Sequence, residues 1–463
     1  MLVNGKVDFT KKVLDWDGFG FNYVETAQTP DYTKDPQDYG GFNHINAKQR
    51  EEILDLVFGP DGLKPNVIKM FLDPFHQNGS NASFDHKTST EWMRYFVREG
   101  YRMNRNANRP MEVITTLYEP PAYITKQNIM RGRDLNPQRI DDLAQYFISW
   151  IKFLKDEEGL PVNHASLHNE GEDYSRWPED GSHGNIGTGH DYNMYWPPEQ
   201  VASFMPVLRR AFDKAGLNSV TVAPGETSNW TRFYNWGYAD AIADNPNAMD
   251  ALGLITSHGF SGGKIGETWY SDHRSAGTDT LRALKPNLHT WTTSMSWGQM
   301  NAAFICMIHA NIYSAKCNCI IPWAGIQRPS LWVGGDPNPG NAIQINEDGT
   351  YEVRKGYYYY KQVSPVGQKG MYIAKTASTH SGTSIIAFTS GKSNAPNAFV
   401  VANASEERAH FLFDILGGGK RYRVYATSND MNNKNLDDFC PVNGKGSVSI
   451  PENSVTTFIQ QED

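Results

Sequence analysis

The sequence predicts a (β/α)8 barrel with an attached antiparallel β-sandwich. Between about residues 16 and 345, short apolar runs rich in β-branched residues alternate with longer amphipathic runs, which is the pattern of repeated strand–helix units. After about residue 350, apolar residues recur at every second position between clusters of turn residues, as in antiparallel strands. We therefore expect a barrel of residues 14–350 and a side sandwich of residues 1–13 and 351–463.

The clearest strand–helix unit begins at Asn136, a favourable helix N-cap that is followed by Pro137 at the first helical position. Apolar residues then recur at helical spacing as far as Leu154, and Gly159 can end the helix. Residues 162–167 read as the buried strand that follows. The same alternation can be traced through the whole barrel region.

Eight strands can be counted in this way. Eight strands with intervening helices favour a barrel over an open doubly wound sheet, which needs a switch point and usually has fewer strands. A glycine-rich phosphate loop is missing after the first strand, which also argues against a nucleotide-binding fold. The strands are expected to begin near Gly18, Val67, Val113, Val162, Val220, Leu252, Leu288 and Cys319.

The sandwich is expected from shorter strands near the C-terminus, with three consecutive glycines, 417–419, among the turn residues. Residues 3–9 also alternate between apolar and polar side chains, so the N-terminal segment can add a strand to the same sheet. The C-terminal strands are expected at residues 384–389, 398–402, 410–415, 422–426 and 454–459.

The composition excludes several classes of protein. A net charge of -8 argues against a nucleic-acid partner, because such binding depends on basic patches, and no apolar run is long enough to span a membrane. Four cysteines are too few for a disulfide scaffold and too scattered for a zinc site. The 12 Trp, 23 Tyr and 22 Phe suit a cleft in which sugars stack on aromatic rings.

Residues at the C-terminal ends of barrel strands face the substrate. The expected strand ends carry carboxylates, amides and aromatic rings, which suits glycoside hydrolysis because a carboxylic acid must protonate the leaving oxygen. A solvated loop charge is an equally good interpretation of Glu25, Glu119 and Glu226, and we expect Glu172 to be solvated. The strand-end residues are Asn22, Tyr23, Glu25, Tyr118, Glu119, His168, Asn169, Glu170, Glu226, His258, Ser294 and Trp323.

The Asn169–Glu170 pair at the end of the fourth strand resembles the acid/base signature of retaining (β/α)8 glycosidases, and most of the chain resembles glycoside hydrolase family 30. Residues 16–20 are similar to that family's opening Gly-Phe-Gly-Gly strand, residues 116–123 to its Ser-Pro-Trp-Ser-Pro-Pro-Ala-Trp element, and residues 257–260 to its sixth strand end. The resemblance implies a barrel with a side β-sandwich, and Glu170 as the catalytic acid/base.

The chain departs from the family pattern in the seventh strand. The pattern has Trp, any residue, Thr or Ser, the nucleophilic Glu, any residue and Ser, whereas residues 291–296 read Trp-Thr-Thr-Ser-Met-Ser. Ser294 thus occupies the nucleophile position. Either the serine was introduced to disable hydrolysis, or the chain is a natural variant with altered chemistry; the intact flanking pattern favours an introduced change.

The sequence therefore predicts a retaining β-glycoside hydrolase without its nucleophile, acting on a β-linked oligosaccharide or polysaccharide. A non-catalytic carbohydrate-binding protein and an inverting glycosidase that uses Glu226 or Glu119 are the alternatives. The expected sugar contacts are Asn169, Tyr118, His258, Trp297 and Trp323.

We expect no cofactor, because two carboxylates suffice for this chemistry. We also expect a monomer that has no nucleic-acid partner and no membrane span. The expected location is secreted or periplasmic. Residues 1–12 lack the apolar segment of a signal peptide, but a secreted parent can be trimmed.

Overall fold

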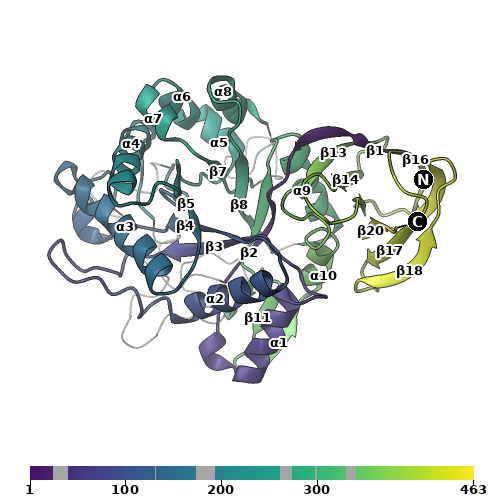
Figure 1. Ribbon diagram of the computed structural model, residues 1–463, viewed down its shortest axis with the longest axis horizontal. Coiled ribbons are helices and arrows are strands. Elements are labelled where there is room, and N and C mark those ends of the chain that lie inside the picture. The colour runs from purple at the N-terminus through teal and green to yellow at the C-terminus, as the bar shows by residue number, and fades with distance from the viewer. Residues whose placement is uncertain are drawn as a thin grey trace.

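Eight parallel strands close into the predicted barrel (Figure 1). The computed structural model describes residues 1–23, 40–130, 132–173, 193–260, 274–297, 300–329 and 340–462. The strand order is β6-β5-β4-β3-β2-β9-β8-β7, and parallel bridges from Val222 to Leu252 and from Thr227 to Ser257 close the ring. The strands are β2 (Gly18–Asn22), β3 (Val67–Leu72), β4 (Glu112–Leu117), β5 (Val162–Ser166), β6 (Thr221–Ala223), β7 (Ile255–Ser257), β8 (Thr290–Ser296) and β9 (Cys319–Trp323).

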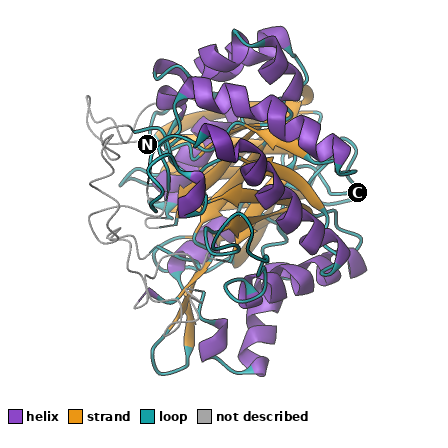
Figure 2. Ribbon diagram, turned by 90° about the vertical axis from the view of Figure 1, so that its left-hand side faces the viewer, coloured by secondary structure: helices purple, strands orange, loops and turns teal. Residues whose placement is uncertain are grey.

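Helices surround the strands, as Figure 2 shows in the view from the barrel side. At the start of α1, the side chain of Asn46 accepts a hydrogen bond from the Gln49 N–H and the Gln49 side chain accepts one from the Asn46 N–H, which is a capping box. The helix expected after Asn136 begins with the 3-10 turn η3 (Pro137–Arg139). The α-helices are α1 (Ala47–Phe58), α2 (Glu91–Asn106), α3 (Ile140–Asp156), α4 (Pro198–Lys214), α5 (Trp230–Asn235), α6 (Tyr238–Ala243), α7 (Pro246–Ala251), α8 (Ala276–Leu284), α9 (Ala302–Tyr313) and α10 (Lys355–Lys361).

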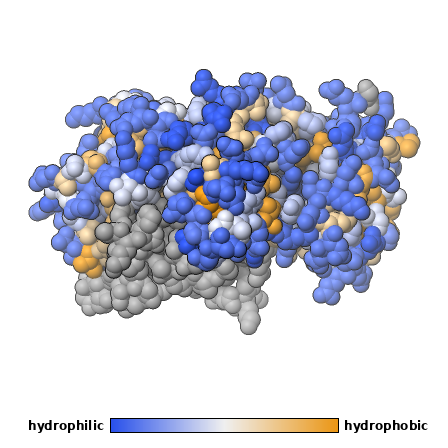
Figure 3. Space-filling model, turned by 90° about the horizontal axis from the view of Figure 1, so that it is seen from below, coloured by the Kyte–Doolittle hydropathy of each residue, from blue (hydrophilic) through white to orange (hydrophobic). Residues whose placement is uncertain are grey.

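The remaining short elements are a small sheet and two 3-10 turns. Strands β10 (Ile326–Gln327), β11 (Ile343–Ile345) and β12 (Tyr351–Val353) form a three-stranded sheet, and η1 (Phe42–His44) and η2 (Ala122–Ile124) are single 3-10 turns. On the face seen in Figure 3 the surface is largely hydrophilic, with small scattered hydrophobic areas. The residues that the structure describes contain no helix long and apolar enough to cross a membrane.

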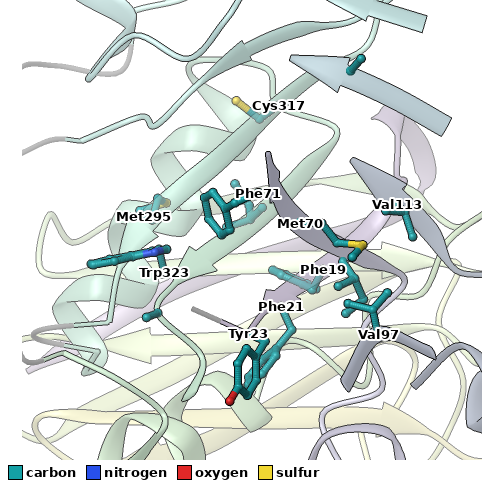
Figure 4. Packing of buried hydrophobic residues seen from close by; sticks show 14 of the residues in the cluster. Phe19, Phe21, Tyr23, Met70, Phe71, Val97, Val113, Met295, Cys317 and Trp323 are labelled. Atoms are coloured by element: carbon teal, nitrogen blue, oxygen red, sulfur yellow. The ribbon is translucent and has the colours of Figure 1, made fainter. Parts of the chain in front are cut away.

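The barrel strands place two kinds of side chain on their two faces. Outward-facing side chains such as Phe21 and Met70 pack with Val97 of α2 in the main core (Figure 4). A separate apolar cluster comprises Val67, Ile114, Ala223, Leu254, Trp291, Cys319 and Ile321. Because this cluster includes the first residues of β3 and β9, it fills the N-terminal end of the barrel interior. Polar side chains that take part in a reaction are therefore expected at the C-terminal end of the barrel.

The side domain is one nine-stranded sheet that folds over on itself. Its order is β18-β17-β20-β15-β14-β13-β1-β16-β19, and the N-terminal strand joins it as predicted. Every strand pair is antiparallel except the parallel pair β1–β16. The strands are β1 (Leu2–Asp15), β13 (Tyr372–Ser378), β14 (Thr383–Thr389), β15 (Ala398–Asn403), β16 (Ala409–Leu416), β17 (Tyr422–Thr427), β18 (Lys434–Phe439), β19 (Lys445–Ile450) and β20 (Ser454–Gln460).

Residues of β15 show how this sheet joins the barrel. All six are buried, because the strand has a covered surface on each face. Phe399 stacks on Phe458 within the sandwich, with ring centroids 4.4 Å apart. Val400, on the opposite face, belongs to the barrel core instead. The Tyr359 hydroxyl of α10 also donates to the Asn453 carbonyl at 2.9 Å, so the two parts share both apolar packing and hydrogen bonds.

Candidate active site

Three ionisable side chains meet at the C-terminal end of the barrel. Glu170 follows β5, Glu226 follows β6 and His258 follows β7. The Glu170 N–H donates to the Glu226 carbonyl at 2.8 Å, and the Glu226 N–H donates to the His168 carbonyl at 2.9 Å. The three residues are buried, with exposed fractions of 7% for Glu170, 0% for Glu226 and 2% for His258. The structure thus brings these predicted strand-end residues together.

Glu170 has an unusual backbone conformation. Its φ of 48° lies in the left-handed region, which residues other than glycine rarely adopt because the Cβ atom crowds the backbone. Such a conformation costs roughly 1–3 kcal/mol and persists only where the surroundings hold it. Here the bridge between Asn169 and Glu226 and the hydrogen bond from the Glu170 N–H hold it. Backbone strain of this kind is concentrated at functional sites.

The His258 imidazole lies between two carboxylates. Its Nδ1 is 2.6 Å from Oε1 of Glu170, and its Nε2 is 3.0 Å from Oε2 of Glu226. Burial by itself lowers the pKa of His258, but the charge of Glu170 and the hydrogen bonds to both carboxylates outweigh it, so the pKa is raised above 6.5. Because both ring nitrogens are engaged, the position does not favour the expected sugar contact by His258.

Glu226 is held as an anion from inside the barrel. Lys69 of β3 forms an ion pair with its Oε2, and the Thr116 hydroxyl of β4 donates to its Oε1 at 2.6 Å. Burial alone raises the pKa of Glu226, but the charge of Lys69 and the hydrogen bond from His258 outweigh it and lower the pKa to about 2, from an ordinary 4.5. Lys69, Glu226, His258 and Glu170 form one continuous chain of contacts, the buried charge array.

We expect Lys69→Met to lower the free energy of unfolding by about 3–5 kcal/mol, because the fully buried charge of Glu226 loses its lysine counter-ion and is left with His258 and Thr116 to offset it. Adding Glu226→Gln removes that charge and should recover part of the loss. The matched control is Lys12→Met, which breaks a half-exposed ion pair with Asp15 and should change stability by roughly 0–1 kcal/mol. Denaturant unfolding at neutral pH measures all three.

The ion pair between Lys69 and Glu226 also makes the free energy of unfolding depend on pH. The pKa of Glu226 is lower in the folded chain than its ordinary 4.5, so its contribution is complete above pH 4.5 and is lost as pH falls through about 2. A cost of Lys69→Met no greater than that of Lys12→Met would contradict this account.

His168 packs beneath the site as a neutral ring. Its Nδ1 accepts a hydrogen bond from the Gly171 N–H at 3.2 Å, and burial lowers its pKa to about 3. Gly225, directly before Glu226, has a φ of 108°, and a Cβ atom there would lie 2.1 Å from Cδ2 of His168. Glycine at 225 is therefore needed for the imidazole to lie against the backbone that carries Glu226.

Ser294 lies at an irregular point of β8. The register with β9 shifts between Thr292 and Met295, as in a β-bulge, which re-aims side chains. The Thr292 hydroxyl donates to Oδ1 of Asn311 at 2.9 Å, and the side-chain amide of Asn311 donates to the Met295 sulfur at 3.5 Å. Because Asn311 lies on the outer helix α9, Thr292 and Met295 both face outward. Two residues instead of one separate these outward-facing side chains, so the bulge interrupts the alternation, and counting back from Met295 places Ser294 on the inward face. Its exposed fraction is 6%.

Two of the expected aromatic contacts lie at the strand ends. Trp323 ends β9, two residues after the inward-facing Ile321, and therefore lies on the inward side above it. The Tyr118 ring lies edge-on to that of Phe71, with centroids 5.8 Å apart, where β4 and β3 end. Asn169 is buried next to Glu170.

Trp297 lies elsewhere. It comes two residues after the outward-facing Met295, and its ring packs edge-on against Tyr360 of α10 at 4.8 Å and Phe21 of β2 at 6.1 Å. This place in the hydrophobic layer outside the barrel does not favour a sugar contact.

The other acidic candidates have different surroundings. Glu119 is fully buried, and Glu25 lies outside the described residues. Glu172 is buried, forms a 3.0 Å ion pair with Arg232 and accepts a 2.9 Å hydrogen bond from the Ser228 N–H. The expectation that Glu172 is solvated is wrong, because α5 brings Arg232 to it.

The sequence reasoning missed Lys69 and Thr116. A signal for Lys69 was available: it is the one charged residue in the apolar strand β3, and a lysine is almost never fully buried unless it is paired. That rule predicts a buried anion but does not say which one.

No protein-family model and no curated protein matches the sequence. Solved structures match the whole chain. The catalytic domain of the family 30 glycoside hydrolase (GH30) xylanase C from Talaromyces cellulolyticus is 15% identical with a TM-score of 0.74, and all of both chains is covered. A GH30 endoxylanase from Clostridium papyrosolvens is 16% identical with a TM-score of 0.69, covering 99% of this chain and 100% of that chain. An endo-beta1,6-glucanase is 17% identical with a TM-score of 0.70, covering 100% and 94% respectively. At these identities the likeness shows the fold, a (β/α)8 barrel with a side β-sandwich as in GH30.

Proposed function

We propose that this chain is a retaining β-glycoside hydrolase of the family 30 type that acts on a β-linked oligosaccharide or polysaccharide and lacks its nucleophile. The observation that carries the proposal is the position of Glu170. It lies at the C-terminal end of β5 in a strained conformation and 2.6 Å from a histidine that can exchange a proton with it. A carboxyl group so held suits a general acid/base, which must give a proton to the leaving oxygen and take one from water.

The second feature of the proposal is the serine at position 294, which we assign to the place of the missing nucleophile. Retaining hydrolysis needs a second carboxylate, whose oxygen bonds to the anomeric carbon. A serine hydroxyl is shorter, and it is a weak nucleophile unless an adjacent base removes its proton. The inward-facing position of Ser294 on β8 supports its assignment to the vacated nucleophile place. Asn169, Tyr118 and Trp323 are the proposed sugar contacts, and a secreted or periplasmic location remains a prediction.

A non-catalytic carbohydrate-binding protein is the second candidate, favoured by the same absence of a carboxylate at 294. The inverting alternative is less well supported. An inverting pair must leave room for a water and a sugar between its carboxyl groups. The His258 ring fills the space between Glu170 and Glu226, and Glu226 and Glu119 are both fully buried.

A glycan array tests the shared part of both candidates. We expect the Ser294 chain to retain one class of β-linked glycan and to release no product from it. Trp323→Ala should weaken that binding by roughly tenfold or more, because a stacking ring is lost. Trp236→Ala is the matched control, since that ring lies under the Arg232 guanidinium at 4.3 Å rather than at a strand end. An array with no bound glycan would contradict both candidates.

A further inference from the structure

The hydrogen bonds of the buried charge array restrict where its protons can be. An imidazole nitrogen placed against a carboxylate oxygen needs one proton between them. Oε2 of Glu226 already accepts from Lys69, and Oε1 accepts from Thr116, so this carboxyl group is the ionised one and the Nε2 of His258 donates to it. One proton then remains for the 2.6 Å contact between Nδ1 of His258 and Oε1 of Glu170. It can lie on either atom.

Both positions of this proton leave the buried charge array with no net charge. With the proton on Nδ1, two cations, Lys69 and His258, face two anions, Glu170 and Glu226, and the array is neutral overall. With the proton on Oε1, only the Lys69–Glu226 pair remains charged, which is again neutral overall. Among the residues that the structure describes, His168 also interacts electrostatically with His258, and it is neutral at ordinary pH because burial lowers its pKa to about 3.

We propose that Glu170 and His258 share one exchangeable proton, and that His258 is a positioning residue that holds this proton until a glycosidic oxygen is bound. In the empty site, water at the barrel mouth stabilises the ion pair, and the proton lies on Nδ1. A sugar that fills the mouth excludes this water. Burial penalises charged groups, so the proton then moves to Oε1 of Glu170. Glu226, fixed by Lys69, keeps the ring oriented throughout.

The number of protons is conserved over the two halves of the proposed reaction. Nδ1 of His258 gives its proton to Oε1 of Glu170, which gives it to the glycosidic oxygen as the bond to the anomeric carbon breaks, and the leaving group departs as an alcohol. The anomeric carbon bonds to a carboxylate, which the Ser294→Glu variant supplies. In the second half, water attacks that carbon and loses a proton to Glu170, and the proton returns to Nδ1. This catalytic part rests on the proposed function.

Histidine NMR tests the shared proton without any activity. In the Ser294 chain with nitrogen-15 histidine, His258 is assigned by comparison with His258→Gln. We expect both of its nitrogens to be protonated at pH 7, and Glu170→Gln to lower its titration midpoint by about one pH unit or more. Glu172→Gln, the same change in a carboxylate that pairs with Arg232, should leave the midpoint unchanged. A neutral His258 at pH 7, or a midpoint unaffected by Glu170→Gln, would overturn the proposal.

Kinetics in the Ser294→Glu background test the delivery of the proton. His258→Gln should lower kcat by roughly tenfold or more on natural glycans and much less on aryl glycosides whose leaving groups need little protonation. His309→Gln, in a half-buried histidine of α9, should affect neither class. An equal loss on both substrate classes would show that His258 is only structural. Failure of Ser294→Glu to hydrolyse any glycan would refute the proposed function, while the NMR result would still decide whether the proton is shared.

Discussion

Ser294→Glu is expected to convert a nearly inert chain into a glycosidase, with hydrolysis of its cognate β-glycan rising by on the order of a thousandfold or more, because the covalent route is unavailable without the carboxylate. The side chain of residue 294 faces the barrel interior, since it follows the β-bulge and directly precedes Met295, which faces outward toward α9. A carboxylate there reaches toward the same end of the barrel as Glu170. The measurement is product release from the glycan class that the Ser294 chain binds.

Ser294→Gln is the matched control. Glutamine has the shape of glutamate but no charge, so it can fill the space without forming a glycosyl ester. It should restore no hydrolysis, and it reports any gain that comes from packing alone. If the Ser294 chain already hydrolyses a natural glycan at an ordinary enzymatic rate, or if the glutamate and glutamine variants behave alike, Ser294 does not occupy a vacated nucleophile position.

Glu170→Gln in the Ser294→Glu background is expected to lower turnover of natural glycans by about 10²–10⁴-fold, the usual contribution of a general acid/base. Bond cleavage in aryl glycosides with good leaving groups needs little protonation, so that step should slow far less. The backbone of residue 170 is held by hydrogen bonds that glutamine retains, so the fold should be preserved. Steady-state kinetics on both substrate classes give the comparison.

Glu172→Gln separates this effect from a general loss of structure. It makes the same chemical change two residues away, at a buried carboxylate that pairs with Arg232 instead of His258. We expect it to reduce stability and to leave the dependence on the leaving group unchanged. Equal losses for Glu170→Gln on both substrate classes would argue against the acid role and would return attention to Glu119 and Glu226.

The fold could be predicted because its signals are local. Each barrel strand begins within three residues of its expected start, since a buried parallel strand is a continuous apolar run and the amphipathic helices mark its limits. The sandwich strands that were missed, β13, β18 and β19, lack that contrast. β18 reads Lys-Asn-Leu-Asp-Asp-Phe and is mostly exposed or half-exposed, so no apolar alternation distinguishes it from a loop.

The sequence by itself determined the barrel, the side sandwich, and the place of Glu170 and Ser294 at the ends of the fourth and seventh barrel strands. The tertiary structure decided their surroundings. Lys69 and Glu226 are 157 residues apart, and only closure of the barrel puts them in contact. Trp297 could be separated from Trp323 only in the structure, where Trp297 follows the outward-facing Met295 beyond the bulge in β8 and alternation along β9 places Trp323 on the inward side. A strand's periodicity is a local property of the chain, whereas the pairing of buried charges depends on which strands become neighbours.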